Sequence, residues 1–231
     1  MGIGTVNERS LHRAIKQWYT RPGDVLEATV DGYVVDILRG ELVIEIQTGS
    51  FSSVAGKLRD LVRSHEVLLV YPIAREKWIV KVAQPDGSRM SRRKSPKRGR
   101  LLNLFDELVY VSDVADHDNF GLEVLLTREE ELTCDDGRGS WRRRGISVVD
   151  RELIEVVEGM RFNGCRDYLR LLPDGLTESF TNRVLAEAAG VRVGTARKMT
   201  YCLRRMGGIR QVAKKGNEKV FEVCCGWLGG D

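Results

Sequence analysis

Two carboxylates and an amide lie in a stretch that otherwise has the composition of a buried β-hairpin. Asp36, Glu45 and Gln47 fall within YVVDILRGELVIEIQTG, residues 33–49. Burying an ionised carboxylate without a partner costs several kcal/mol or forces its pKa upward. These side chains therefore either face water or surround a positive charge, and the second arrangement would be a metal site.

Hairpin geometry allows such a site. If residues 39–40 form a two-residue turn, Asp36 faces Val43, and Glu45 becomes its diagonal neighbour on the same face of the sheet. Diagonal Cβ atoms lie about 7–8 Å apart or somewhat less. The oxygens of both carboxylates can then reach one Mg²⁺, which binds oxygen at about 2.0–2.1 Å. Gln47 would orient a water or substrate oxygen beside them. A half-exposed strand with alternating polar residues accounts for the same pattern without chemistry.

The elements around the hairpin predict an α/β domain with a mixed sheet. Apolar residues at helical spacing predict helices, and apolar runs bounded by turn residues predict strands. The predicted order is a helix at 7–19, strands at 25–30, 33–38 and 41–47, a helix at 52–64, and strands at 66–73 and 77–83. The helix at 52–64 is the crossover that a parallel strand pair requires.

This αβββαβ order, with Asp36 on the second strand and Glu-Ile-Gln at 45–47 on the third, resembles the PD-(D/E)XK nuclease superfamily with its restriction-endonuclease-like fold. The resemblance covers about residues 7–83. It implies that Asp36 and Glu45 bind Mg²⁺ or Mn²⁺ and that Gln47 occupies the position of the family's catalytic lysine. An amide carries no positive charge, so this substitution puts the activation of water in doubt.

Two further residues are candidates through the same resemblance. Lys57, near the start of the helix at 52–64, could replace the missing lysine, although an ordinary solvated residue fits the position slightly better. Glu8, on the first helix, could be a third metal ligand, and the capping box that begins at Thr5 explains it equally well. His12, one turn further on, is expected to be a half-buried helix residue rather than a base.

The C-terminal part resembles another family. LAEAAGVRVGTARKMTYCLRRMG, residues 185–207, resembles a helix-turn-helix, and a helix before it and a hairpin at 209–223 complete a winged helix over about 165–224. The resemblance implies contact with DNA bases by the second of these helices and contact with phosphates by the wing. The helix residues are Arg192, Thr195, Arg197 and Lys198, and the wing residues are Lys214, Lys215 and Lys219. A winged helix that contacts protein is the alternative.

Residues 84–100 have no periodicity and are predicted to be an exposed loop or linker that gains order on nucleic acid. The candidates for phosphate contact are Arg92, Arg93, Lys94, Lys97 and Arg98. The stretch GSWRRRG at 139–145 is a weaker candidate. The three consecutive glutamates at 129–131 are expected to lie on a solvated strand edge. The segment LLNLFDELVYVSDV at 101–114 could be helix or strand, and VVDRELIEVVEGM at 148–160 is predicted to be helical.

Charge is distributed unevenly along the chain. Residues 85–100 hold 7 basic and 1 acidic side chains, residues 177–231 hold 10 and 5, and residues 101–150 hold 5 and 12. Two basic blocks around an acidic middle favour a polyanionic partner. Five cysteines without a paired CxxC spacing argue against a zinc site and a disulfide framework. No apolar run has the length of a membrane span, so a cytoplasmic protein is expected.

These patterns predict a nuclease-like core at 1–84, a basic linker at 85–100, an extension of the core at 101–158 and a winged helix at 159–231. The function predicted is a metal-dependent endonuclease that cuts double-stranded DNA. The alternative is a DNA-binding protein or transcriptional regulator whose nuclease-like domain has lost catalysis, and a nuclease that acts on RNA stays open. A homodimer is possible, although no heptad or long apolar stripe marks an interface.

Overall fold

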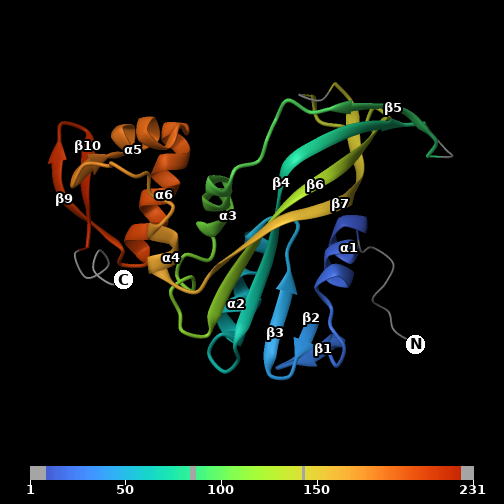
Figure 1. Ribbon diagram of the computed structural model, residues 1–231, viewed down its shortest axis with the longest axis horizontal. Coiled ribbons are helices and arrows are strands. Elements are labelled where there is room, and N and C mark those ends of the chain that lie inside the picture. Colours follow the sequence, from blue (N-terminus) through green and yellow to red (C-terminus); the bar gives the residue numbers. More distant parts are fainter. Residues whose placement is uncertain (1–8, 84–86, 142–143, 225–231) are drawn as a thin grey trace.

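A computed structural model describes residues 9–83, 87–141 and 144–224. This part of the chain contains a long mixed sheet of seven strands and a smaller three-stranded sheet surrounded by helices (Figure 1). The strand order of the large sheet is β1-β2-β3-β4-β6-β7, and β5 pairs with β4 beside it. The fold is therefore mixed α/β.

The first four elements form as their patterns predict. Helix α1 (Ser10–Tyr19) buries Leu11 and Ile15 against the sheet. Strands β1 (Val25–Val30), β2 (Tyr33–Arg39) and β3 (Leu42–Ile46) follow as an antiparallel meander. Asp31 and Gly32 turn the chain between β1 and β2, where both have positive φ, at 48° and 81°.

The turn between β2 and β3 differs from the prediction by one residue. Arg39 pairs with Leu42, so Gly40 and Glu41 form the turn, and Gly40 takes a φ of 60° that suits glycine. The predicted register with Asp36 facing Val43 is therefore wrong, because Val43 pairs with Leu38. A glycine at the first central position accounts for the shift, since the tight turn forms where a left-handed conformation costs least.

The crossover brings β4 parallel to β3. A 3-10 turn η1 (Phe51–Ser53) leads into helix α2 (Ala55–Leu61), and the chain returns as β4 (Val67–Val82). The two strands predicted at 66–73 and 77–83 are this one continuous strand. Pro72 is tolerated there because β3 pairs with β4 only up to Val70 and β5 pairs with it only from Trp78 onward.

Beyond the crossover the sheet extends into a long arm built from β5 (Arg89–Lys94), β6 (Phe120–Asp135) and β7 (Ile146–Phe162). The loop predicted at 84–100 is thus wrong over residues 89–94, which pair with the edge of β4. The helix predicted at 148–160 is also wrong. Its apolar residues are largely β-branched, and pairing with β6 along the whole segment decides in favour of the strand.

Strand β7 is an edge strand with three β-bulges. Pairing with β6 shifts register three times, and each shift leaves one residue outside the ladder: Val149, Ile154 and Val157. All three side chains are exposed. Bulges twist and blunt an edge that would otherwise offer a long template for pairing with another chain.

Strand β6 carries the three glutamates at 129–131, and the solvated edge predicted for them is wrong. Strand β6 lies between β4 and β7, and all three side chains are buried. Glu130 accepts hydrogen bonds from Arg89 at 2.5 Å and Arg92 at 2.6 Å, and Glu131 accepts one from Lys77 at 2.6 Å. Cations from β4 and β5 thus offset the cost of burying Glu130 and Glu131.

Two short elements link β5 to β6, a 3-10 turn η2 (Leu101–Leu104) and the single-turn helix α3 (Phe105–Leu108). Figure 1 shows α3 between the large sheet and the C-terminal helices. The apolar core on this face is continuous, since Leu58 and Leu69 belong to the same buried cluster as Phe105, Met199 and Leu203.

The C-terminal part contains the predicted helices and hairpin. They are α4 (Cys165–Leu169), α5 (Asn182–Ala189), α6 (Val193–Arg205), β9 (Ile209–Lys215) and β10 (Glu218–Val223). A short additional strand, β8 (Ser179–Thr181), pairs with β10. Thr181 caps α5 by accepting from the backbone of Arg183 and Val184, and Gly190 ends it at φ 59°. Within the residues described, no helix has the length and apolarity needed to span a membrane.

Candidate functional site

Asp36 interrupts the regular pairing of β2. The register Ile37↔Ile44 places Asp36 beside Glu45 on the neighbouring strand, one step beyond the last pair described between β2 and β3. Val35 and Ile37, only two residues apart, pack into the cores on opposite faces of the sheet. The normal alternation of strand faces is therefore broken at Asp36.

The Asp36 carboxylate occupies the gap between β2 and β3. Its Oδ2 accepts a hydrogen bond from the backbone of Ile46 at 2.8 Å and lies 3.2 Å from Nε2 of His12 on α1. Burial opposes ionisation of Asp36, but the hydrogen bond and charge of His12, together with the Ile46 backbone, outweigh it and lower the pKa of Asp36. His12 is partly buried, as predicted, and it also holds this carboxylate.

Glu45 has the opposite electrostatic character. Burial and then the negative charge of Asp36 raise the pKa of Glu45, and Lys57 opposes the rise only in part. The two carboxylates are thus close enough to repel each other. A second cation between them would relieve this repulsion.

Lys57 approaches Glu45 from helix α2. Its Nζ lies 2.6 Å from Oε2 of Glu45 and donates to the backbone oxygen of Val34 at 2.6 Å. Only 14% of the Lys57 side chain and 10% of the Glu45 side chain are exposed. The prediction that Lys57 is an ordinary solvated residue is therefore wrong, because the crossover places its side chain over the end of β3.

The Gln47 side chain forms hydrogen bonds within the loop after β3. Its Nε2 donates to the backbone oxygen of Ser50 at 2.8 Å and to Oγ of Ser53 at 2.6 Å, and its Oε1 accepts from Gly49 at 3.4 Å. The positive charge near Glu45 comes from Lys57. Glu8, the remaining candidate ligand, lies outside the described residues.

Asp36 and Glu45 are the two side chains here that could contribute oxygen ligands to a hard cation such as Mg²⁺. Asp36 and Glu45 offer carboxylate oxygens, and the hydrogen bonds above engage Oδ2 of one and Oε2 of the other. Mg²⁺ is commonly bound through one or two carboxylates while it keeps several waters. In the described ranges, no three His, Cys, Asp or Glu side chains gather in a group that could hold a metal.

Two charged residues that are distant in the sequence, one on a helix and one on a strand, form hydrogen bonds with the loop that follows β3. Glu107 of α3 accepts from Oγ of Ser50 at 2.8 Å and from the backbone of Phe51 at 3.0 Å. Arg151 of β7 donates to the backbone oxygen of Thr48 at 2.6 Å. Sequence reasoning missed both residues, and nothing in their local pattern signals the contact.

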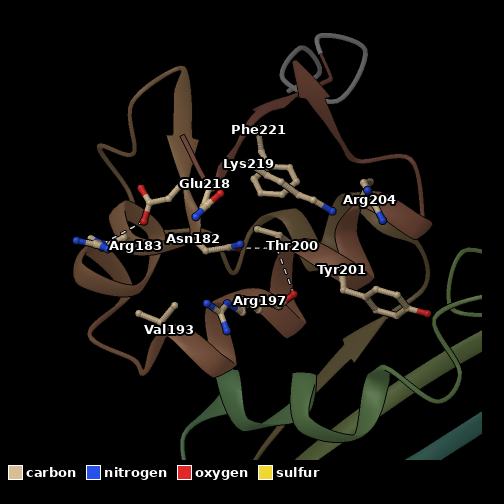
Figure 2. Close-up of a pocket in the computed structure, with 11 residues that line it drawn as sticks. Asn182, Arg183, Val193, Arg197, Thr200, Tyr201, Arg204, Glu218, Lys219 and Phe221 are labelled. Atoms are coloured by element: carbon tan, nitrogen blue, oxygen red, sulfur yellow. Dashed lines mark hydrogen bonds and ion pairs between the residues drawn. The ribbon is translucent and has the colours of Figure 1, made fainter. Parts of the chain in front are cut away.

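A second candidate site is the cleft between α6 and the β9–β10 hairpin, about 340 Å³ in volume. Figure 2 shows Arg197, Tyr201 and Arg204 along α6, with Lys219 and Phe221 on the strand opposite. Arg197 and Arg204 make this face of the helix basic. At one end the cleft is closed by Arg183 and Glu218, whose charged atoms lie 3.1 Å apart.

The basic residues predicted on α6 and the hairpin do not all face this cleft. Arg192 precedes α6 and is exposed, Thr195 is half-buried, and Arg197 lines the cleft. Lys198 instead points to α3, where its Nζ donates to Asp106 at 2.8 Å. The remaining candidates lie on the hairpin and are exposed: Lys214, Lys215 and Lys219.

Tyr201 and Arg204 were not among the sequence candidates. They follow Arg197 by four and seven residues, the spacing of one helix face, and that spacing is the signal that could have found them.

The basic residues of the 84–100 segment are mostly committed to carboxylates. Arg92 pairs with Glu130 and lies 4.7 Å from the centre of the Trp78 ring. Glu76 lies 2.8 Å from Lys94 and 4.0 Å from Arg98. Arg93 and Lys97 are exposed. Residues 89–94 are therefore ordered as part of the sheet without a nucleic acid. The stretch around Trp141 extends into residues 142–143, which lie outside those described.

Comparison with known proteins gives a family without a described activity. A curated protein of Treponema pallidum (strain Nichols), described as an uncharacterized protein, is 30% identical over 225 residues, which cover 96% of this chain and 87% of that protein. No solved structure matches the chain. The family described as "Domain of unknown function (DUF8091)" matches residues 9–163, which include both carboxylates and the whole large sheet. The chain belongs to this DUF8091 family.

Proposed function

We propose that this protein is a divalent-metal-dependent nuclease that hydrolyses phosphodiester bonds in double-stranded DNA. The observation that carries the proposal is the cluster of Asp36, Glu45 and Lys57 at the point where β2 and β3 separate. The meander β1–β3, the crossover through α2 and the parallel β4 agree with the order of a PD-(D/E)XK core.

In this proposal Asp36 and Glu45 hold Mg²⁺ or Mn²⁺. The bound ion would lower the pKa of a water and neutralise charge that develops on the scissile phosphate. His12 and the Ile46 backbone keep Asp36 ionised and oriented. Lys57 favours the ionised form of Glu45 and so opposes part of the effect of its burial, and the Lys57 ammonium would also be available to a phosphate oxygen beside Glu45.

The C-terminal part would bring the duplex to this site. Helices α4, α5 and α6 with the three-stranded sheet β8-β10-β9 have the order of a winged helix. Arg197 and Arg204 on α6 and Lys219 on the hairpin would contact the DNA backbone and grooves from the two sides of the cleft. Ten basic residues against five acidic ones over 177–231 support an anionic partner.

Cleavage assays with the full chain test the proposal. Supercoiled and linear DNA are incubated with Mg²⁺ or Mn²⁺, with and without EDTA, and compared for the wild type and the variants Asp36→Asn, Glu45→Gln and Lys57→Met. Lys81→Met, at an exposed position of β4, is the matched control for the lysine variant. We expect cleavage by the wild type and Lys81→Met alone, and only with metal. Cleavage that survives EDTA and both carboxylate variants would refute the assignment.

One observation favours the second candidate, a DNA-binding protein without catalysis. Gln47 replaces the lysine of the resembled pattern, and its amide is engaged in the loop. Binding of duplex DNA in a salt titration, unaffected by Asp36→Asn and Glu45→Gln and without cleavage in either metal, would establish that candidate instead. A structured RNA of equal length in the same assays distinguishes a nuclease that prefers RNA.

A further inference from the structure

Helix α3 contacts both the α6 helix and the loop that leaves β3, through consecutive residues. Asp106 accepts a hydrogen bond from Lys198 of α6 at 2.8 Å. Glu107 accepts from Oγ of Ser50 at 2.8 Å and from the Phe51 backbone at 3.0 Å. One turn of helix thus joins segments that lie about 90 and about 57 residues away along the chain.

The loop held by Glu107 leads directly to the candidate nuclease site. Ser50 is the N-cap of η1, and η1 runs into α2. The Ser50 backbone oxygen accepts from Gln47, two residues after Glu45. On the other side of η1, Lys57 of α2 reaches Glu45 at 2.6 Å. A displacement of Ser50 and Phe51 would therefore move the residues on both sides of the Glu45–Lys57 pair.

Packing makes α3 a rigid link. Phe105 and Leu108 are fully buried in the core that also contains Leu58 of α2 and Met199 of α6. Just before α3, Arg100 donates to the backbone oxygens of Gly190 at 2.7 Å and Ala189 at 2.9 Å, at the end of α5. Close-packed interiors transmit small displacements instead of absorbing them.

We propose that Glu107 is a positioning residue that fixes the β3–α2 loop, and with it Glu45 and Lys57, relative to the α6 helix. The inference rests on the proposed nuclease function. Lys198 then serves to dock α6 on α3, and the face of α6 that contains Arg197 and Arg204 meets the nucleic acid. DNA held on that face would reach the cluster at a set distance from where it is bound.

The test compares Glu107→Ala, Glu107→Gln and the wild type. An amide oxygen at position 107 can still accept from Ser50 and Phe51, so Glu107→Gln should retain activity. Glu107→Ala should lower kcat with KM for DNA unchanged, and by less than the about 10-fold to 100-fold loss that follows removal of a group bonded directly to a metal ligand, because Glu107 bonds to the loop and not to Asp36 or Glu45. Glu76→Ala, which removes an ion-paired carboxylate from the arm, is the matched control and should cleave like the wild type.

An unchanged kcat in Glu107→Ala would overturn the positioning role while leaving the nuclease function intact. So would an equal loss in Glu107→Gln and Glu107→Ala. If the wild type cuts no DNA, the nuclease function fails. Hydrogen exchange then tests separately whether Glu107 fixes the β3–α2 loop. Faster exchange of the 47–57 amides in Glu107→Ala than in Glu107→Gln would support it, and identical exchange would overturn it. Melting curves of each variant identify any that fails to fold.

Discussion

Replacing Lys57 with methionine separates the charge of this residue from its volume. Lys57 lies 2.6 Å from Glu45, and both side chains are largely buried. Removing one partner of a buried pair leaves the other charge without compensation, which costs about 3–5 kcal/mol. Asp36 adds repulsion, because its charge already raises the pKa of Glu45. We therefore expect Lys57→Met to destabilise the fold in a way that depends on pH.

Proton uptake by Glu45 limits the loss. From the ordinary pKa of 4.5, each pH unit is worth about 1.4 kcal/mol, so the electrostatic cost reaches at most about 3.5 kcal/mol at pH 7 and under about 1 kcal/mol at pH 5. The sign follows from linkage: a carboxyl whose folded pKa is raised destabilises the fold above its unfolded pKa, and this effect disappears as pH falls. For a chain of this length, about 3.5 kcal/mol lowers Tm by roughly 7–14 °C, which is the largest shift expected.

Thermal unfolding followed by circular dichroism at pH 7 and pH 5 measures the effect. Lys81→Met, on an exposed part of β4, should melt within about a degree of the wild type at both values, as surface substitutions usually do. The double variant Lys57→Met/Glu45→Gln should recover most of the loss at pH 7, because position 45 then holds no charge that lacks a partner. An equal loss for Lys57→Met at pH 5 and pH 7 would show that packing, not the ion pair, is what Lys57 contributes.

Four other substitutions have defined outcomes. Arg197→Ala and Arg204→Ala should each weaken duplex binding in fluorescence anisotropy and reduce the slope of log affinity against log salt by about 1, and an unchanged slope would remove that arginine from the interface. Glu129→Gln should raise Tm at pH 7.5 but not near pH 4, because burial raises the pKa of Glu129 and its Oε2 lies buried without a hydrogen-bond partner among the described residues. A lower Tm at pH 7.5 would contradict this reasoning. Glu130→Gln should loosen β5, since the hydrogen bonds from Arg89 and Arg92 weaken. Relative to the wild type, amide exchange should become faster over 89–94 and stay the same over β3.

Local sequence pattern was sufficient for the N-terminal meander and for the C-terminal helices. Alternation and turn residues identified β1, β2 and β3, and the resemblance of residues 185–207 to a helix-turn-helix identified α5 and α6. These segments carry their own signals because a turn or a cap is decided by residues that are neighbours in the chain. The one error, the position of the β2–β3 turn, moved Asp36 from a diagonal position to one beside Glu45.

Pattern failed where pairing over long distances decides the structure. The segment 148–160 has charged and apolar residues that fit a helix, but β6 pairs with it throughout and makes it a strand. Glu129, Glu130 and Glu131 would be solvated on an edge strand, and they are buried because β4 and β7 flank β6 on both sides. Neither neighbour is visible from the residues themselves.

The sequence by itself determined which residue types are available for chemistry: two carboxylates on adjoining strands, a lysine on the helix that follows, and a basic C-terminal helix. Only the tertiary structure decided that Lys57 closes over Glu45, that His12 holds Asp36, and that Lys198 docks on α3 instead of facing outward. The physical reason is that the energy of a buried charge depends on the groups within a few ångströms of it. In a folded chain those groups come from elements that the local pattern does not connect.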